Sequence, residues 1–275
     1  MTKKTFFYSA ALLLSACFFG ACGGDDDDDS DGSKNYTTSV TVEKSANVAQ
    51  DFGTDDLSIG YWKSGEAIAV LDKNATTVKS LGTLSVQSTG SRDAKFKGTL
   101  RGLFTSSSSF TIYSPSSAVN GSNITYTYTD QDGTISKIYK FDYAKATATS
   151  KLVQDNANNL EINTATLASE QAICKFSFVD ENGNKIKVNI LGITSASGVA
   201  KEVVNGQAST GKLTITNGNS DKDDPIYVAI KNTKSTSDTF TFNVTTPDSK
   251  SYIGTATFAC APNTFVNKSV TLTEE

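Results

Sequence analysis

The chain has 275 residues, a formal net charge of −4 and no histidine. The small negative charge gives no electrostatic reason to expect binding to nucleic acid or to an anionic membrane surface. The absence of histidine removes both the commonest general base and the commonest metal ligand, so it argues against an enzyme of the usual acid–base or metal-dependent kinds.

The N-terminus is built like a secretory signal peptide. Lys3 and Lys4 form a short positive region, and an apolar run from Phe6 to Ala21 ends in small residues before a cysteine. This run is shorter than the roughly 20 residues that a membrane-spanning helix needs. It is similar to a bacterial lipoprotein signal, in which the cysteine is acylated and becomes the new N-terminus. We therefore expect a lipoprotein signal peptide over residues 1–21 and a lipid anchor in the outer membrane.

Two cysteines compete for acylation. The stretch Leu14-Ser15-Ala16-Cys17 is the better match to the general lipobox, whereas Cys22 stands almost directly before an acidic run. Acylation of Cys17 would leave Phe18 and Phe19 on the mature N-terminus without a role. We therefore expect lipidation of Cys22, with Cys17 as the alternative. A cleaved ordinary signal with an incidental cysteine is the remaining alternative.

The segment that follows, residues 22–35, is dominated by Asp25–Asp29 and Asp31. Like charges repel one another, so we expect an acidic, disordered tether. Acidic residues just after the lipid cysteine also resemble the surface-export signal of Bacteroidota lipoproteins. That resemblance implies that the folded part is exposed on the cell surface.

Roughly 240 residues remain after the tether, which is enough for two domains of ordinary size. In the first of them, short β-branched or aromatic runs are separated by Gly, Asn and Asp, which is the pattern of strands and hairpins. The predicted strands are Thr37–Glu43, Glu66–Leu71, Val78–Val86, Ala94–Leu100, Ser109–Tyr113, Asn123–Thr129, Thr134–Phe141 and Leu160–Thr164. The Ala-containing stretch Asp142–Asn159 is less regular and is predicted to be a loop or a short helix.

The second half repeats this style. The clearest hairpin joins Gln171–Val179 to Lys185–Ile193 through Asn182-Gly183, a pair that suits the positive φ angles of a tight turn. Further strands are predicted at Lys201–Val204, Lys212–Thr216, Ile226–Ile230, Thr239–Val244, Ser251–Cys260 and Phe265–Thr273. No useful window has the apolar spacing of a helix. The sequence therefore predicts an all-β protein with two tandem β-sandwiches, an N-terminal one over residues 36–164 and a C-terminal one over residues 165–275.

Cys174 and Cys260 are candidates for a disulfide. The period of two places Cys174 on the same strand face as Phe176, and Cys260 on the same face as Phe258, so both thiols are expected to point into the second core. In an oxidising compartment this bond would stabilise the fold by about 4 kcal/mol on the chain-entropy estimate. The alternative is two buried free thiols that pack as small apolar groups.

No motif indicates catalysis or cofactor binding, so we expect no catalytic residues, no metal and no cofactor. There is no histidine to activate a thiol, and the sequence has neither a Gly-rich phosphate loop nor a Gly-x-Ser-x-Gly motif. The acidic turns Asp130–Gly133 and Asp221–Asp224 would supply only some of the oxygens that calcium needs, and such residues are common in hairpin turns. Trp62 and the tyrosines of Asn123–Thr129 either stack on a sugar or pack in the fold.

With the strands in place, the chain resembles the fimbrillin family, the pilin-like surface lipoproteins of Bacteroidota that form type V pili. The resemblance is carried by short motifs in a fixed order. They are the lipoprotein signal with its Asp run, Trp62–Val70 (WKSGEAIAV), Phe96-Lys97-Gly98, Phe110–Pro115 (FTIYSP), Ala172–Phe178 (AICKFSF) and Asn267–Leu272 (NKSVTL). Together these motifs cover nearly the whole chain.

The resemblance implies two transthyretin-like β-sandwiches and assembly by strand exchange. In the family, a trypsin-like protease removes the first strand of the lipidated precursor, and the exposed groove then accepts a strand from the next subunit. Here the candidate first strand is Tyr36–Glu43, and the candidate processing site is Lys44, which departs from the family pattern. The best-known members are cut after Arg, whereas Arg92 and Arg101 lie inside the first domain. The sequence ends at Glu275 directly after its last strand, so no C-terminal donor segment is expected.

The expected function is that of a non-enzymatic structural subunit (shaft, tip or anchor) of a cell-surface fimbria that mediates adhesion. Its expected partners are other fimbrial subunits, the outer membrane through the lipid anchor, and a host or bacterial surface ligand, but no nucleic acid. It would be a surface-exposed outer-membrane lipoprotein, or part of a fimbrium if processed. The alternative is a stand-alone lipid-anchored binding module for a glycan or host ligand, with Trp62, Tyr126 and Tyr128 as its platform.

Overall fold

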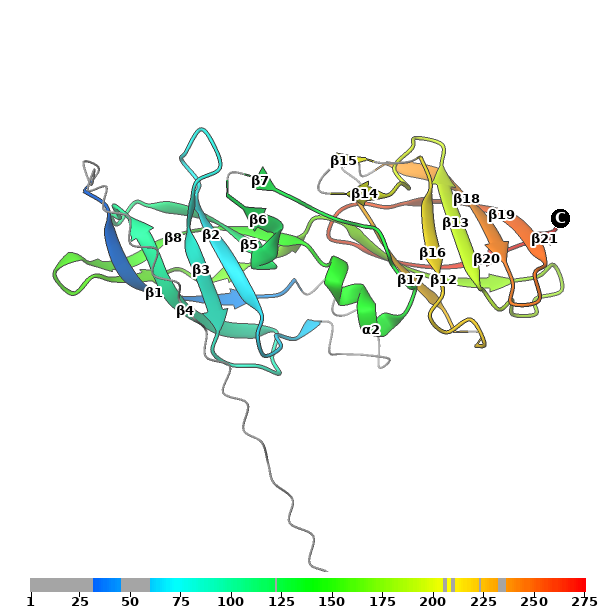
Figure 1. The fold of residues 1–275 in the computed structure, drawn as a ribbon, viewed down its shortest axis with the longest axis horizontal. Coiled ribbons are helices and arrows are strands. Elements are labelled where there is room, and N and C mark those ends of the chain that lie inside the picture. The colour runs from blue at the N-terminus through cyan, green and yellow to red at the C-terminus, as the bar shows by residue number, and fades with distance from the viewer. Residues whose placement is uncertain are drawn as a thin grey trace, which may run out of the picture. The chain divides into compact units, whose positions relative to one another are not determined.

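The computed structural model describes residues 32–45, 60–121, 123–204, 207–208, 211–222, 224–231 and 236–275. Strands dominate these residues, which confirms the predicted all-β class (Figure 1). The chain divides into two units, Met1–Gly32 and Ser33–Glu275. The predicted signal peptide, Cys17, Cys22 and most of the acidic tether lie outside the described residues, so the fold below is that of the second unit.

The first half of this unit forms one large sheet. Its strands are β1 (Lys34–Glu43), β2 (Ala67–Asp72), β3 (Ser80–Val86), β4 (Asp93–Gly102), β5 (Ser109–Ser114), β8 (Ala144–Gln154), β9 (Asn159–Ile162), β10 (Ala165–Thr166) and β11 (Ala168–Ser169). A separate small pair consists of β6 (Val119–Asn120) and β7 (Asn123–Ile124). Short helical turns occupy Ser116–Ala118, Tyr139–Phe141 and Asp155–Ala157, and α2 spans Ile135–Ile138.

This sheet closes on itself. Its hydrogen-bonded order runs β1-β4-β3-β2-β5-β8, and β9 pairs with β8 on one side and with β1 on the other, so seven strands form a barrel-like ring. Closure leaves no free edge within the ring. The first half therefore differs from the expected sandwich because β9 returns as a hairpin from β8 and reaches β1. Residues 165–169 still belong to this sheet, through β10 and β11, beyond the expected boundary.

The core of the first half lies inside this ring. Alternation along each strand turns one set of side chains inward, and the largest fully buried ones are Trp62, Tyr36, Phe96 and Phe110. The rings of Trp62 and Phe96 meet edge to face with their centroids 4.7 Å apart.

The predictions for the two consecutive stretches between Thr134 and Asn159 were wrong. The stretch Asp142–Asn159 contains the strand β8 instead of a loop or a short helix. Its inward residues include Ala144, Ala146 and Ala148, and alanine is a poor strand former that owes its place here to packing. The predicted strand Thr134–Phe141 is instead the helical turn α2 with a 3-10 turn after it, because Ile135 and Ile138 lie three residues apart and pack on the same neighbours.

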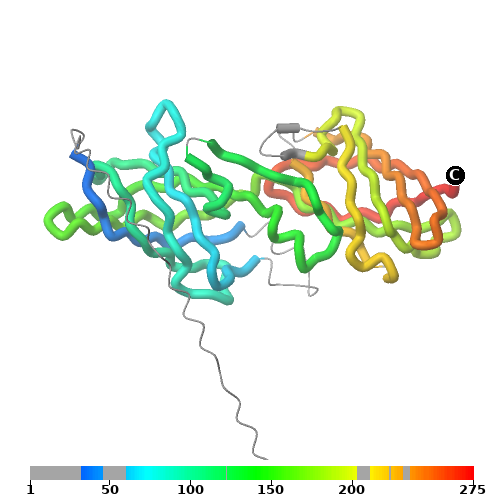
Figure 2. Tube along the Cα trace, in the orientation of Figure 1, coloured from blue at the N-terminus to red at the C-terminus, as the bar shows by residue number. Residues whose placement is uncertain are grey.

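The second half contains two sheets that share one core. The three-stranded sheet has the order β17-β12-β20, and the five-stranded sheet has the order β16-β13-β18-β19-β21. The bounds are β12 (Ala172–Val179), β13 (Ile190–Ser195), β16 (Leu213–Thr216), β17 (Ile226–Ile230), β18 (Ser237–Thr245), β19 (Ser251–Ala259), β20 (Phe265–Thr271) and β21 (Thr273–Glu274). A separate small pair is formed by β14 (Val203–Val204) and β15 (Gln207–Ala208). Figure 2 traces this half from the green of β12 to the red of β20.

The predicted hairpin around Asn182-Gly183 is only half right. The turn is present, since Gly183 has a φ of +84° and its N–H donates to the Asp180 carbonyl at 3.0 Å. The strands on either side separate after one bridge, between Val179 and Lys185, and enter different sheets. Each sheet buries its apolar face against the other, and that packing outweighs the local hairpin.

A segment from the first half covers the outer face of the three-stranded sheet. Tyr128 and Ile138 pack against Ile173, Tyr227 and Ala229, which are the residues of β12 and β17 that point away from the main core. The predicted strand Asn123–Thr129 is a true strand only at Asn123–Ile124. The alternating tyrosines of this stretch, Tyr126 and Tyr128, pack in this cluster and not in a strand.

Gln131 fastens the same segment to β17. Its side-chain amide donates to the Ala229 carbonyl at 3.0 Å and its side-chain oxygen accepts from the Ala229 N–H at 2.7 Å. This side chain therefore takes the place of a neighbouring strand along that part of β17.

Candidate functional site

The strand β1 occupies a special position because it is the first strand in the described part of the chain and also completes the ring. It pairs with β4 along its full ten residues, from Lys34 opposite Gly102 to Glu43 opposite Asp93. On its other side it runs parallel to β9 and then to β10. Removing β1 would therefore open the sheet and leave unpaired backbone groups on both sides of the gap.

The inward face of β1 fills part of the core. Tyr36, Val40 and Val42 are buried, and Thr38 lies between them. The Tyr36 ring meets Phe104 with their centroids 4.9 Å apart. The indole N–H of Trp62 donates to the Val42 carbonyl at 2.9 Å. The sequence thus provides a strand whose alternate side chains fit a groove that the rest of the first half forms.

The C-terminal end of β1 is held by backbone hydrogen bonds and by the Arg92 side chain. The Lys44 N–H donates to the Arg92 carbonyl at 2.9 Å, and Nη2 of Arg92 donates to the Lys44 carbonyl at 3.1 Å. The same Nη2 lies 3.3 Å from Oε1 of Glu43. The backbone of Lys44 is therefore held at both its N–H and its C=O.

The Lys44 side chain is held as well. Its Nζ lies 3.0 Å from Oε1 of Glu66, donates to the Tyr61 carbonyl at 3.3 Å and stands 4.4 Å from the centre of the Trp62 ring. Only 13 % of this side chain is exposed. A protease that reads the Lys44 side chain cannot reach it until these contacts open.

Sequence reasoning selected Lys44 but missed its partners. Trp62 and Glu66 belong to the motif Trp62–Val70, and Tyr61 directly precedes it. In the sequence this motif is only a signature of the family. A carboxylate four residues after a core tryptophan was the available signal. Sequence spacing could not show that this carboxylate meets Lys44, because the two residues belong to different strand regions that only the fold brings together.

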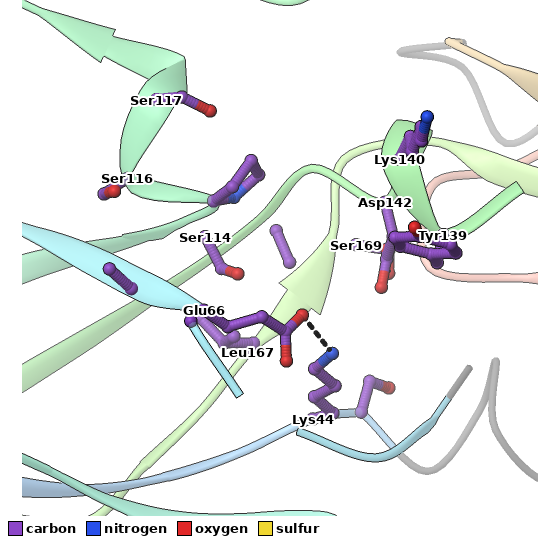
Figure 3. Close-up of a pocket in the computed structure, with 15 residues that line it drawn as sticks. Lys44, Glu66, Ser114, Ser116, Ser117, Tyr139, Lys140, Asp142, Leu167 and Ser169 are labelled. Atoms are coloured by element: carbon purple, nitrogen blue, oxygen red, sulfur yellow. Dashed lines mark hydrogen bonds and ion pairs between the residues drawn. The ribbon is translucent and has the colours of Figure 1, made fainter. Parts of the chain in front are cut away.

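A cavity of about 490 Å³ with both polar and apolar lining residues lies beside Lys44, within the size range of small-molecule sites (Figure 3). Residues from widely separated elements line it. The polar side chains in this lining include Lys44, Glu66, Ser114, Tyr139, Asp142 and Ser169.

Both carboxylates in this cavity already serve the fold. Glu66 pairs with Lys44 through Oε1 and accepts from the Lys63 N–H through Oε2. Oδ1 of Asp142 accepts from Oγ of Ser169 at 2.6 Å and from Nε2 of Gln171 at 2.9 Å. Their arrangement supports a structural role for the two acids at the junction of β1, β2 and β11, rather than acid–base chemistry.

The two candidate thiols of the second half meet in its core. Cys174 lies on β12 and Cys260 directly follows β19, and their Sγ atoms are 3.9 Å apart. Both are free and buried in the structure. The predicted orientation of both thiols toward one core is confirmed, whereas the disulfide itself stays a prediction.

The proposed aromatic platform is not formed. Trp62 and Tyr128 are 1 % and 0 % exposed. The hydroxyl of Tyr128 donates to Oε1 of Gln171 at 2.9 Å, and Nζ of Lys231 lies 3.4 Å from the centre of the Tyr126 ring. Burial raises the pKa of Tyr128, because the charged form of the hydroxyl would lose its contact with solvent. These three aromatic side chains therefore support the fold and do not offer a surface for stacking on a sugar.

The acidic turn Asp130–Gly133 also serves local structure. The Asp132 carboxylate lies 2.7 Å from Nζ of Lys137 and accepts from both the N–H and the hydroxyl of Thr134. Among the described residues, no group of three or more Cys, Asp or Glu side chains is arranged to hold a metal ion. Within that same part of the chain, no helix has the length and apolarity to cross a bilayer.

No family model matches the chain, and no curated protein matches it. Among solved structures, it is similar to one described as a "putative cell adhesion protein" from Bacteroides uniformis, with 10 % identity over 88 % of this chain and 96 % of that one, at a TM-score of 0.48. A protein of the same description from Bacteroides fragilis has 10 % identity over 88 % and 97 % of the two chains, at a TM-score of 0.46.

A shaft pilin from Lactobacillus rhamnosus is also similar, with 12 % identity over 86 % of this chain and 98 % of that one, at a TM-score of 0.34. The structural neighbours of this chain are thus described as cell adhesion proteins and pilins. The proposal that follows rests on features of the chain itself.

Proposed function

We propose that this chain is a fimbrillin-like structural subunit of a cell-surface fimbria and that it assembles by β-strand exchange. The observation that carries the proposal is β1. It is the first of the described strands, it completes a closed sheet by pairing with β4 along its whole length and with β9 on its other side, and a basic residue that a trypsin-like protease can read follows it directly. The ordered sequence motifs of the family support the same conclusion.

Loss of β1 would create a site that only another strand can fill. The groove would expose the core positions of Tyr36, Val40 and Val42. It would also expose the hydrogen-bonding edges of β4 and β9. An extended segment from a second subunit, with apolar residues at alternate positions, would restore both kinds of contact.

The energies favour a regulated exchange over a spontaneous one. Burying each of three apolar side chains is worth about 1.5–3 kcal/mol, and the strand ladder adds to this. An intact β1 tethered to its own sheet therefore wins against a free strand from another molecule. Cleavage after Lys44 would remove the tether, after which a donor at high local concentration can compete.

The remaining parts of the proposal follow from the sequence. Lipidation at Cys22, with Cys17 as the alternative, would anchor the precursor in the outer membrane and present the folded part at the cell surface. The second half, with two sheets over one core, is the part that we propose to be a transthyretin-like sandwich. Adhesion to host or bacterial surfaces would be the work of the assembled fibre.

The test is the N-terminus of the protein in its different assembly states. Purified protein would be treated with a trypsin-like protease and separated by size, and the N-terminal residue of each fraction would be determined by mass spectrometry. We expect Ser45 at the N-terminus of high-mass assemblies and intact β1 in monomers. The matched control is Lys44→Gln, which should resist cleavage at this bond and remain monomeric.

Two results would count against the proposal. One is a protein that begins at Ser45 and stays a stable monomer at high concentration. The other is a fibre recovered from cells in which every subunit keeps β1. The binding-module alternative lacks its aromatic platform, because Trp62 and Tyr128 are buried and the half-buried Tyr126 ring is in contact with Lys231.

A further inference from the structure

The two thiols of the second half come from different sheets. Cys174 is in β12, the central strand of the three-stranded sheet. Cys260 follows β19 of the five-stranded sheet. They are separated by 86 positions in sequence. A link between them would fasten one sheet to the other across the core.

Their geometry is close to that of a bonded pair. The Sγ atoms are 3.9 Å apart, in van der Waals contact, whereas a disulfide needs about 2.05 Å. A gap of this size lies within reach of a change of χ1 at either residue. The exposed fractions of Cys174 and Cys260 are 0 % and 1 %, so each thiol faces the other inside an apolar core that includes Phe176 and Phe258.

We propose that Cys174 and Cys260 are an oxidation site and form a disulfide that joins the two sheets of the second half. Two thiols are oxidised, one S–S bond forms, and two protons and two electrons leave. The electrons are accepted by an external disulfide of the kind that oxidising dithiol proteins or oxidised glutathione carry, which is reduced to two thiols. The proposal requires export to an oxidising compartment, which the signal-like N-terminus predicts, and does not require fimbrial assembly.

Burial determines when the bond can form. Desolvation, with the neighbouring thiol adding to it, raises the pKa of Cys174 well above its usual range, so the thiolate that attacks a disulfide is scarce in the folded protein. The bond should therefore form while the second half folds, and not afterwards. For the same reason, it should resist reductants until the protein is unfolded.

The consequence is a difference between the two halves. A bonded second half keeps its sheets together when β1 is removed and the first half opens. The bond would thus confine any opening to the ring, whether or not the protein enters a fibre.

The experiment uses the full chain unfolded in urea with reductant and then refolded in two parallel samples. One sample refolds with a mixture of reduced and oxidised glutathione, and the other refolds with reductant only. Free thiols are blocked in denaturant, and tryptic peptides are analysed by mass spectrometry. The sequence supplies clear reporters, since Cys174 falls in the peptide Leu152–Lys175 and Cys260 in Ser251–Lys268.

We expect these two peptides to be linked in nearly all of the oxidised sample and in none of the reduced one. The oxidised protein should melt on the order of 10 °C higher than the reduced protein. Reductant added to the folded oxidised protein should cleave the link slowly, and urea should accelerate this cleavage. A Cys260→Ala variant should show no link and no effect of the redox conditions on melting.

Full blocking of both thiols after oxidative refolding would overturn the proposal. So would a link of either peptide only to Cys17, Cys22 or glutathione. Neither result would affect the test at Lys44, so the two proposals can fail separately.

Discussion

The two halves of the folded chain bury their apolar faces in different ways. The first half closes one sheet into a ring, and the closing strand is the N-terminal β1. The second half stacks two separate sheets on a shared core, and among the described strands these sheets end at β17, β20, β16 and β21. The integrity of the first half thus depends on one terminal strand, whereas that of the second depends on packing between sheets.

This difference suggests which half of the molecule can open while the other stays folded. A ring that loses its closing strand is left with an open groove and without the stability that this strand supplied, until another strand fills the groove. A sandwich that loses one sheet loses its core. Substitutions in each half can therefore break or confirm this contrast.

The largest effect should come from removing β1. A chain that begins at Ser45 loses three buried apolar side chains, worth about 1.5–3 kcal/mol each, and a ten-residue ladder. This cost is comparable to the typical total stability of a domain, about 5–15 kcal/mol, so the first half should lose its cooperative unfolding. Urea unfolding monitored by amide exchange should show the loss in the first half and a protected second half.

A synthetic peptide covering 33–44 should restore the missing transition. The same peptide with Val40→Asp should not, because it places a charge in the core. If the shortened chain unfolds with an unchanged midpoint without any peptide, β1 is not the closing element that we describe.

A core truncation in each half is the next test. Phe176→Ala removes a buried ring that contacts Phe242 and Phe258, and should cost about 3–5 kcal/mol. Phe96→Ala should cost a similar amount in the first half. Amide exchange should report each loss mainly in the half that carries the substitution. Equal loss of protection in both halves from either variant would show that they unfold as one unit.

Gln131→Ala should weaken the attachment between the halves. It leaves the buried N–H and C=O of Ala229 without their partner, and we expect a loss of about 2–4 kcal/mol in the free energy of unfolding, measured in urea. The matched control is Gln87→Ala. The Gln87 side chain is exposed and donates to the carbonyls of Ser85 and Val86 next to it in sequence, so its loss should change stability by less than about 0.5 kcal/mol. Equal effects of the two variants would show that Gln131 does not hold the two halves together.

High pH should weaken the same attachment. The pKa of Tyr128 is raised in the fold by burial, so above the unfolded pKa of about 10 only the unfolded chain ionises at this residue. The contribution of the neutral Tyr128 hydroxyl to the free energy of unfolding is fully present below pH 10, and it is lost as the pH rises above 10. At pH 11 the loss should be about 1.4 kcal/mol relative to pH 8. Tyr128→Phe, compared at the same two pH values, should lack this part of the loss.

The smallest change in stability should come from Glu66→Gln. It breaks a partly exposed ion pair with Lys44 worth about 0.5–1 kcal/mol. Because that pair holds Lys44 away from a protease, trypsin should cut after Lys44 roughly two to five times faster, in line with the larger opened population. The matched control is Glu161→Gln, which breaks the exposed pair with Lys151 and should leave cleavage at Lys44 unchanged. Equal rates for both variants and the native chain would show that Glu66 does not protect Lys44.

Much of the fold could be predicted from the residues. Alternating runs located β1, β2, β4, β5 and most strands of the second half, because a sheet with one buried face imposes a period of two. The prediction failed where that signal is ambiguous. The alanines at the inward positions of β8 led to the prediction of a loop or a short helix. The alternating tyrosines near Tyr128 led to the prediction of a strand, although they pack on another sheet.

The candidate site was only partly predictable. Lys44 and the two core thiols could be selected from the order of residues. Their environment could not, since Arg92, Glu66 and Tyr61 reach Lys44 only through the pairing of β1 with β4 and the packing of Trp62. The 3.9 Å separation of Cys174 and Cys260 likewise depends on how two sheets stack.

Local alternation of apolar and polar residues was enough to predict the all-β class, the position of β1 and the shared core of the two thiols. The same local pattern does not show that the first sheet closes, that the halves are joined through Gln131, or that Lys44 is shielded. These features depend on pairing between distant segments. The free energy of such pairing comes from which apolar faces meet, and no local pattern specifies that.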